Sequence, residues 1–131
     1  MKDYKQLLKI AEEARVKAYA PYSSFFVGAA LLCDDGTVYQ GCNIENASFT
    51  PTCCAERVAV FKAVSEGKRD LRAIAVVGGK EGEKRGFCYP CGVCRQVLSQ
   101  FCKEDFEIIL SAENEVRVTT LGELLPHSFK F

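Results

Sequence analysis

The residues of this chain whose types and spacing could do chemistry are two groups of cysteines and one glutamate. Cys53 and Cys54 are adjacent and are followed by Glu56, and Cys91 and Cys94 stand further along with two residues between them. Cysteine thiolates bind zinc, and three of them leave one position of a tetrahedral site open, as a catalytic zinc site requires. Adjacent side chains leave a regular backbone in different directions, so at most one of Cys53 and Cys54 is expected to bind that ion.

Other interpretations of the cysteines compete with a catalytic metal site. The eight cysteines could form disulfides, although eight allow about 105 pairings and nothing in the sequence selects one. Cys91 and Cys94 could be a dithiol redox pair, which leaves the first cysteine pair unexplained. A closed structural site with four cysteines would give Glu56 no role. The candidates for the fourth ligand of such a site are Cys53, Cys88 and Cys102.

The composition is that of an ordinary globular chain. Its 131 residues predict one compact domain over residues 1–131, and its 17 basic side chains are balanced by 17 acidic ones. This balance argues against a nucleic-acid polymer as partner. The sequence has neither a secretory signal nor an apolar run of about 18 residues, so we expect a cytoplasmic protein that does not bind a membrane. In a reducing compartment the cysteines are expected to be thiols or metal ligands.

The elements that must position these residues follow from hydrophobic periodicity and turn signals. Helices are expected over residues 3–19, from 52 or 53 to 66, over 91–102, and from 120 onward; strands are expected over 26–33, 37–43, 71–77, 106–110 and 116–119. The expected caps are Asp3, Gly67 and a capping box from Thr120 to Glu123. This order predicts an α/β fold in which helices cover both faces of a mixed sheet. Cys91 and Cys94 then stand at a helix start, about 60° apart in projection, where both thiolates can reach one ion.

The spacing around Glu56 distinguishes between the two adjacent cysteines. Zinc deaminases carry the pattern H-x-E…P-C-x-x-C, with His or Cys as first ligand and the glutamate as an acid and base that does not bind the metal. Cys-Ala-Glu at 54–56 and Pro-Cys-Gly-Val-Cys at 90–94 match this pattern. It predicts Cys54, Cys91 and Cys94 as zinc ligands and Glu56 as the catalytic proton carrier. Cys53 has the wrong spacing and is expected to be a bystander.

The chain also resembles the small cytidine deaminases of the homotetrameric, three-cysteine type. The stretches that carry the resemblance cover nearly the whole length: AYAPYSSF (18–25), VGAAL (27–31), GCNIENAS (41–48), CAER (54–57), FKAVSEG (61–67), PCGVCRQ (90–96) and ELLP (123–126). The resemblance implies a three-layer α-β-α fold with a five-stranded mixed sheet and one Zn²⁺ per subunit. It implies hydrolytic deamination of cytidine and 2'-deoxycytidine to the uridines, with release of ammonia, in pyrimidine salvage. It also implies a homotetramer with shared active sites.

The same resemblance implies roles for residues that would bind the nucleoside. Phe25 would stack near the base, and the backbone of Ala55 would help to hold the pyrimidine. Asn43 and Glu45 would bind the ribose hydroxyl groups. Phe129, near the end of the chain, would enter the pocket of a neighbouring subunit.

Two further residues are implied to act on the metal ligands. Arg57 and Gln96 would contact the zinc-bound sulfurs, and Arg57 would draw electron density away from a thiolate. The remaining cysteines Cys33, Cys42 and Cys102 are expected to be small buried apolar side chains. Three other functions stay open: deamination of another small cytosine-bearing molecule, deamination of a polynucleotide, and a zinc-stabilised assembly module without enzymatic activity.

Overall fold

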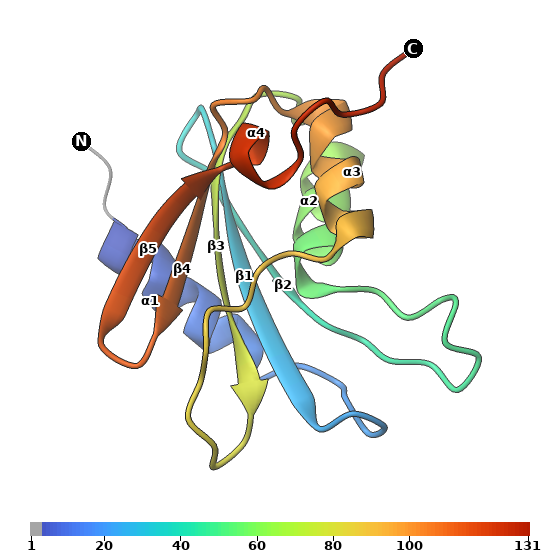
Figure 1. Ribbon diagram of the computed structural model, residues 1–131. Helices are drawn as coiled ribbons and strands as arrows, with labels where there is room; N and C mark the ends of the chain where they lie inside the picture. Colours follow the sequence, from blue (N-terminus) through green and yellow to red (C-terminus); the bar gives the residue numbers. More distant parts are fainter. Residues whose placement is uncertain (1–3) are drawn as a thin grey trace.

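The computed structural model describes residues 4–131 and shows one β-sheet between two layers of helices (Figure 1). The elements are α1 (Tyr4–Arg15), β1 (Phe25–Cys33), β2 (Val38–Cys42), α2 (Ala55–Ser65), β3 (Leu71–Lys80), α3 (Gly92–Phe101), β4 (Glu107–Ala112), β5 (Glu115–Thr120) and α4 (Leu121–Leu124). The predicted order of elements is therefore confirmed. Within residues 4–131, no helix is long and apolar enough to cross a membrane.

The sheet is mixed, and its strands follow the order β2-β1-β3-β4-β5. Strands β3 and β4 run parallel, and the other three neighbouring pairs are antiparallel. The apolar strand β1 lies between β2 and β3, which explains why its sequence is a nearly continuous apolar run: it is buried on both faces. The parallel step from β3 to β4 passes through α3, so the second cysteine group lies on a crossover connection.

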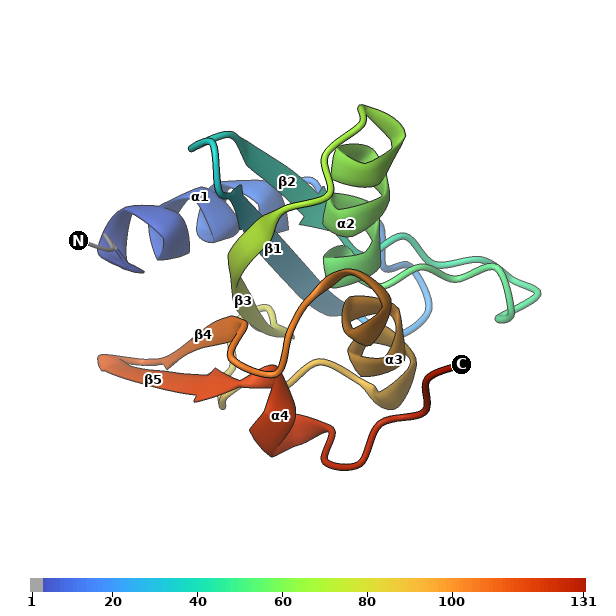
Figure 2. The same cartoon turned by 90° about the horizontal axis from the view of Figure 1, so that it is seen from above.

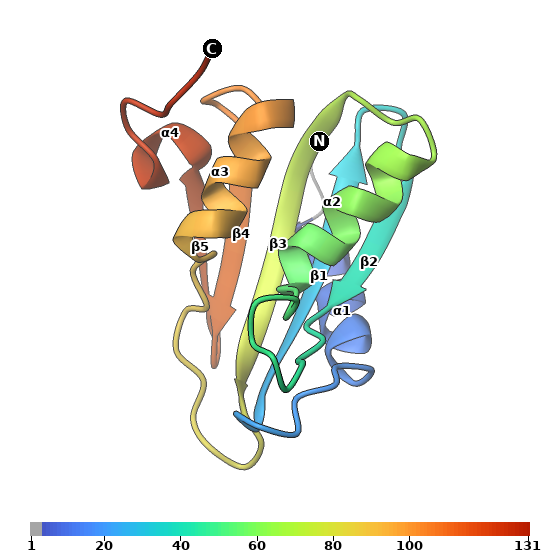
Figure 3. The same cartoon turned by 90° about the vertical axis from the view of Figure 1, so that its right-hand side faces the viewer.

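Helix α1 covers one face of the sheet, and α2 and α3 cover the other (Figures 2 and 3). Leu7, Leu8 and Ala11 of α1 pack against one set of strand side chains, which includes Ala30 and Val77. The opposite set packs against α2, α3 and α4; its members include Leu31, Ile74, Val76, Ile108 and Leu110. The alternation of neighbouring strand residues between these two cores confirms the predicted three-layer α-β-α fold.

Several element boundaries differ from those predicted. Helix α1 ends at Arg15 instead of residue 19, and the expected cap Asp3 lies outside the described residues. The reason is a tertiary contact that periodicity cannot reveal. The N–H of Tyr19 donates to the carbonyl of Asn43 and the N–H of Glu45 donates to the carbonyl of Tyr19, each at 2.9 Å. Residue 19 is therefore extended against the segment after β2 and cannot continue the helix.

Helix ends with a local sequence signal agree better with the predictions. Gly67 has a φ of 93°, and its N–H donates to Val64 O, while Lys68 N–H donates to Ala63 O. This pair of bonds is a Schellman motif, which closes the end of α2. Thr120 and Glu123 form the predicted capping box at the start of α4.

One close contact between β2 and α2 sets the position of the helix that carries the first cysteine group. A Cβ atom at Gly41 would lie 2.2 Å from the carbonyl oxygen of Ala55 and 2.6 Å from the amide nitrogen of Ala59. Both atoms belong to the backbone of α2 and cannot move aside as a flexible side chain could. Glycine at position 41 therefore lets the N-terminal half of α2 lie directly on the sheet.

Candidate active site

The three cysteines predicted as ligands meet at the N-termini of two neighbouring helices. Cys54 is the N-cap of α2, Cys91 is the N-cap of α3, and Cys94 lies in the first turn of α3. Their sulfur atoms all lie within 4.8 Å of one another. Helices α2 and α3 lie next to each other on the same face of the sheet and start at the same end of it (Figure 3). This arrangement brings together cysteines from two separate parts of the chain.

Helix N-termini favour the thiolate form of these cysteines. Neither Cys54 nor Cys91 caps its helix with a side-chain hydrogen bond, so the sulfurs stay available at the helix end where the first backbone N–H groups have no partner within the helix. The helix dipoles add a partial positive charge at the same place. The predicted helix start at residue 52 or 53 was slightly too early, and the correction places Cys54 at the cap itself.

The geometry of the cluster fits a tetrahedral zinc ion. The Sγ atoms of Cys54 and Cys91 are 3.8 Å apart. Two sulfurs at about 2.3 Å from one zinc, at the tetrahedral angle, would be separated by about 3.8 Å. Three thiolates that converge in this way form a zinc donor set with a fourth position for another ligand, so Cys54, Cys91 and Cys94 are the residues that would hold Zn²⁺.

Arg57 brings a positive charge to the cluster from within α2. Its Nη2 atom donates a hydrogen bond of 3.4 Å to the sulfur of Cys54, and its Nε atom is buried without a partner among residues 4–131. The thiol of Cys94 also donates to Cys54. That bond lowers the pKa of Cys54 to about 5, against the effect of burial, and the hydrogen bond and charge of Arg57 act in the same direction. The bond raises the pKa of Cys94, which stands as the donor.

Glu56 lies in the first turn of α2 and is buried, with 4% of its surface exposed. Burial raises its pKa to about 7, and the neighbouring charge of Cys54 also raises it. A carboxyl group whose pKa lies near neutrality can both take and return a proton under physiological conditions. The glutamate singled out by the sequence pattern thus stands beside the cysteine cluster with the acidity that proton transfer needs.

A cavity of about 270 Å³ adjoins the cysteines and Glu56. It is lined by predicted site residues from four segments: Phe25, Asn43, Glu45, Cys54, Ala55, Glu56 and Cys91. Ser23, Val27, Thr52, Cys53, Cys88 and Tyr89 complete the lining. The cavity therefore brings two of the three predicted metal ligands, the predicted acid–base carboxyl group and four of the predicted nucleoside contacts to one place.

The Asn43 side chain is held by the first residues of β1. Its Oδ1 accepts from the N–H of Val27 at 2.9 Å, and its Nδ2 donates to the carbonyl of Phe25 at 2.8 Å. The amide keeps one further donor hydrogen and one further lone pair for a ligand. This buried asparagine therefore continues the pairing of the sheet and still presents polar atoms to the cavity.

Glu45 is held by the turn before β1. One carboxylate oxygen, Oε1, accepts from the N–H groups of Tyr22 (2.9 Å) and Ser23 (3.1 Å), and the other, Oε2, accepts from the hydroxyl of Ser23. These hydrogen bonds, that of the Ser23 hydroxyl first, lower the pKa of Glu45 from its ordinary value. The carboxyl group is therefore an anion that accepts hydrogen bonds.

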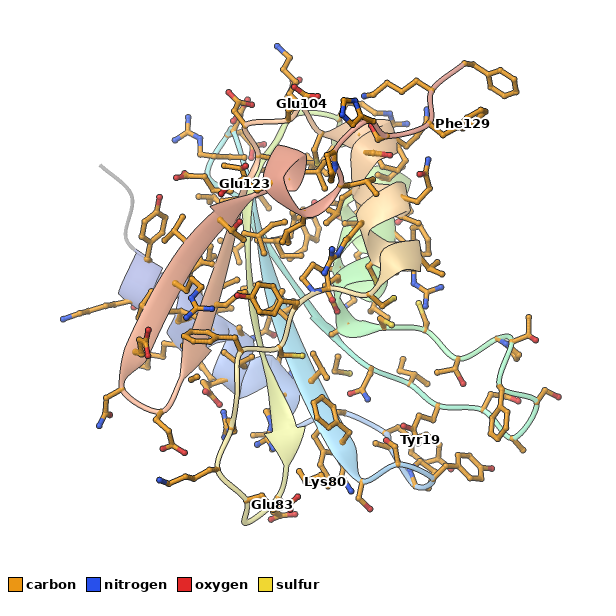
Figure 4. All side chains as sticks on the ribbon, in the orientation of Figure 1. Tyr19, Lys80, Glu83, Glu104, Glu123 and Phe129 are labelled. Carbon is orange, nitrogen blue, oxygen red and sulfur yellow. The ribbon has the colours of Figure 1, made fainter. Side chains whose placement is uncertain are left out.

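Two predicted site residues, Gln96 and Phe129, neither line this cavity nor belong to the cysteine cluster with its Arg57. Phe129 is on the C-terminal segment, at the opposite end of the molecule from Tyr19 and Lys80 (Figure 4). Its ring is 68% exposed and packs against Phe131, with ring centroids 5.6 Å apart. The Nε2 atom of Gln96 donates to the carbonyl of Phe129 at 3.5 Å. The contacts expected of Gln96 with a sulfur and of Phe129 with a neighbouring subunit stay predictions.

The other cysteines are all free thiols. Cys33 and Cys102 are buried in the core, as expected, whereas Cys42 is only half-buried. Cys53 has a structural role that its side chain does not reveal. Its backbone exchanges two hydrogen bonds of 2.9 Å with Ile44, which fasten the Asn43–Glu45 segment to the start of α2.

Sequence reasoning missed two groups around the cavity. Ser23 had no assigned role, although the short spacing between Ser23 and Phe25 is typical of a turn in which a serine hydroxyl binds a nearby N–H. The backbone bridge of Cys53 carries no signal in residue type at all.

A cluster of thiolates beside a buried carboxyl group, at the edge of a pocket, is the arrangement of a zinc enzyme with its own acid–base group.

Comparison with known proteins places the chain within a family. Residues 1–110 match the family described as "Cytidine and deoxycytidylate deaminase zinc-binding region", and this range contains all three clustered cysteines. The chain therefore belongs to the cytidine and deoxycytidylate deaminase family, and it is a zinc-binding enzyme of that family.

Individual relatives are similar over nearly their whole length. A cytidine deaminase of Halalkalibacterium halodurans is 49% identical, with 97% of this chain and 94% of the relative covered. One of Sporosarcina psychrophila is 48% identical, with 97% and 91% covered. The crystal structure of a cytidine deaminase from Burkholderia pseudomallei superposes with a TM-score of 0.90 at 47% identity, with 98% of this chain and 100% of that chain covered.

Proposed function

We propose that this chain hydrolyses cytidine and 2'-deoxycytidine to uridine and 2'-deoxyuridine with release of ammonia. The observation that carries the proposal is the position of Glu56: it is buried, its pKa is raised to about 7, and it borders the same cavity as the cysteine cluster and the polar residues Asn43 and Glu45. The names of the full-length relatives support the same substrate class. Cys54, Cys91 and Cys94 would hold Zn²⁺, which would supply a Lewis acid that makes water a nucleophile near neutral pH.

Glu56 moves the protons of the reaction. As a carboxylate it accepts a proton from the attacking water and delivers it to N3 of the pyrimidine, while a C–O bond forms at C4. Glu56 then accepts the proton of the hydroxyl group now on C4 and delivers it to the amino nitrogen; the C4–N bond breaks, the C4=O double bond forms, and ammonia leaves. Its pKa near neutrality serves both steps, because the group must be ionised to accept and protonated to donate.

The other residues around the cavity bind and orient the nucleoside. The Phe25 ring would stack near the base, and the backbone of Ala55 would hold the pyrimidine. Asn43 and the anionic Glu45 would bind ribose hydroxyl groups, for which an acceptor-only carboxylate is suited. Arg57 donates to Cys54 and draws electron density from the thiolate, which offsets the surplus negative charge of three thiolates around one divalent ion.

We also propose that the chain forms a homotetramer whose active sites are shared between subunits. Phe129 is exposed on the C-terminal segment, and Phe61 on α2 and Val93 on α3 are also exposed. Large apolar side chains that are exposed in a single chain can be buried by contact with another chain. In the tetramer Phe129 would complete the pocket of a neighbouring subunit, and Gln96, whose Nε2 donates to the Phe129 carbonyl in the single chain, would contact the zinc-bound sulfurs.

The proposed setting is the cytoplasm and pyrimidine salvage, with residues 1–131 acting as a single deaminase domain. Eight free thiols suit a reducing compartment. A free nucleoside that is deaminated enters the uridine pool, which is the chemistry of salvage. The near-zero net charge argues against a polynucleotide substrate.

The test is a panel of cytosine nucleosides followed by the absorbance change on conversion to uridine. The wild-type chain is expected to deaminate cytidine and deoxycytidine, and Glu56→Gln is expected to stay folded and loaded with zinc but to lose at least about 100-fold in kcat, as for a missing acid–base group. A wild-type chain that binds zinc but deaminates no cytosine nucleoside would favour a zinc-stabilised assembly module. Preference for a different cytosine-bearing molecule would reassign the substrate.

Shared active sites have a separate test, because the two halves of each pocket come from different chains. Glu56→Gln and Phe129→Ala are each expected to have low activity. Mixed tetramers are expected to regain part of it, since an intact Glu56 in one subunit then meets an intact Phe129 from another. Mixing without any gain, under conditions where subunits exchange, would show that Phe129 does not act across an interface.

A further inference from the structure

Ser23 joins two parts of the cavity that are far apart in the sequence. Its hydroxyl oxygen accepts a hydrogen bond of 3.0 Å from the N–H of Phe25, the first residue of β1. Its hydroxyl hydrogen is donated to Oε2 of Glu45, 22 residues away. The directions of both bonds are forced, because an amide N–H can only donate and an ionised carboxylate can only accept.

The turn that carries Ser23 has a backbone conformation that lets its hydroxyl group bond to both Phe25 and Glu45. Ser24 has a φ of 57°, in the left-handed region that residues with a Cβ seldom adopt. In this conformation the Ser23 hydroxyl accepts from the N–H of Phe25, two residues further along the chain. The N–H groups of Tyr22 and Ser23 both donate to Glu45. Backbone strain of this kind persists only where the surrounding contacts hold it.

The hydrogen bonds around Glu45 leave it with little remaining capacity. A carboxylate has about four lone-pair sites. Two on Oε1 are filled by backbone N–H groups, and one on Oε2 is filled by Ser23. One acceptor site is left, on the oxygen that Ser23 holds. The Ser23 hydroxyl, which itself borders the cavity, therefore decides which lone pair of that oxygen stays free.

We propose that Ser23 is a positioning residue for the ribose: it orients Oε2 of Glu45 so that its free lone pair accepts a sugar hydroxyl. This inference rests on the proposed function of Glu45 as a ribose contact. Ser23 also ties Glu45 to Phe25, and Phe25 is tied to Asn43 through its carbonyl. The groups assigned to the base and the sugar thus form one hydrogen-bonded unit.

The experiment compares cytidine with 2',3'-dideoxycytidine, which lacks the 2' and 3' hydroxyl groups of the ribose. Ser23→Ala is expected to lower kcat/KM for cytidine about tenfold, mainly through KM, since a hydrogen bond to a charged group is lost. It is expected to change kcat/KM for the dideoxynucleoside less than about twofold, and Ser23→Thr, which keeps the hydroxyl, is expected to restore cytidine activity. Ser24→Ala is the matched control, because it also removes a hydroxyl group from this turn. It is expected to leave unchanged the ratio of kcat/KM for cytidine to kcat/KM for the dideoxynucleoside.

The outcomes separate this proposal from the proposed function. Equal losses on both nucleosides, or no loss on either, would overturn the positioning role of Ser23. If Glu45→Gln discriminates between the nucleosides and Ser23→Ala does not, only the inference about Ser23 is wrong. If Glu45→Gln does not discriminate either, the ribose contact itself is wrong. Ser23 is exposed, so Ser23→Ala is expected to fold; Ser23→Cys, with a weaker donor, is the second variant and is expected to show an intermediate loss on cytidine alone.

Discussion

The sulfur atoms of Cys54 and Cys91 lie 3.8 Å apart although the two residues are 37 positions apart in the sequence. Each residue is the N-cap of its helix, so the contact between them is also the contact between the N-termini of α2 and α3. A bound Zn²⁺ would link these two helices and would therefore stabilise the fold in addition to its role in the chemistry.

The first prediction concerns the two adjacent cysteines. Cys54→Ala is expected to lose zinc and activity together, because it removes one of three sulfurs from the cluster. Cys53→Ala is expected to keep zinc and most of the activity, since Cys53 contributes its backbone and not its sulfur. Zinc content by metal analysis and cytidine turnover measure both effects. The reverse pattern would mean that the metal site is built around Cys53.

The second prediction concerns the charge that Arg57 places beside Cys54. Arg57→Gln is expected to weaken zinc affinity or to lower kcat by about 10- to 100-fold, the usual effect of removing a partner of a metal ligand. Arg72→Gln is the control, because Arg72 lies near the start of β3, pairs with the exposed Asp34 and is not part of the Cys54–Cys91–Cys94 cluster. Competition with a chelator gives the affinity, and steady-state kinetics give kcat. A zinc affinity and a kcat both equal to those of the wild type would show that Arg57 has no effect on the metal site.

The third prediction concerns the close packing of α2 on β2. Gly41→Ala is expected to lower the free energy of unfolding by about 3 kcal/mol, at the upper end of what overpacking costs, because its Cβ would meet the backbone of α2 at 2.2 Å. Gly86→Ala is the control, since a Cβ there has nothing within 4 Å. Urea denaturation of the zinc-loaded proteins measures the difference. Equal stability of the two variants would show that α2 can shift away from the sheet at little cost.

The fourth prediction concerns pH and the carboxylate of Glu45. The pKa of Glu45 is lowered, so its charged form and the ribose contact are expected to persist as pH falls through the ordinary glutamate pKa of about 4.3 and to be lost only below it. The ratio of the Kd values of uridine and 2',3'-dideoxyuridine isolates this contact, because the titration of Glu56 affects both ligands alike.

In Ser23→Ala, the ratio of the two Kd values is expected to change at a higher pH than in wild type. The variant lacks the Ser23 hydroxyl hydrogen bond, which is the largest cause of the lowered pKa of Glu45. The contribution of the Glu45 charge to the stability of the fold depends on pH in the same direction. It is fully present above the pKa that Glu45 has in the unfolded chain, and it is lost as pH falls through the pKa that Glu45 has in the folded chain. Superimposable pH curves for wild type and Ser23→Ala would show that the Ser23 hydroxyl does not stabilise the Glu45 anion.

The amino-acid sequence by itself determined the order of the elements and the members of the metal cluster. Strand β1 was predictable because a strand buried on both faces is apolar throughout, and the ends of α2 and α4 were predictable because glycine and capping-box signals act locally. Cys54, Cys91 and Cys94 could be assigned because zinc ligation and acid–base chemistry restrict both residue type and spacing.

Only the tertiary structure decided how those residues are placed and what acidity they have. The pKa of Glu56 is raised because the packed protein excludes water from it, and no property of the neighbouring sequence gives that burial. The end of α1 at Arg15, the bond from Ser23 to Glu45 and the backbone bridge of Cys53 join segments that are distant in sequence. Contacts of this kind arise from packing of whole elements, whereas propensities and spacing describe only what lies within a few residues along the chain.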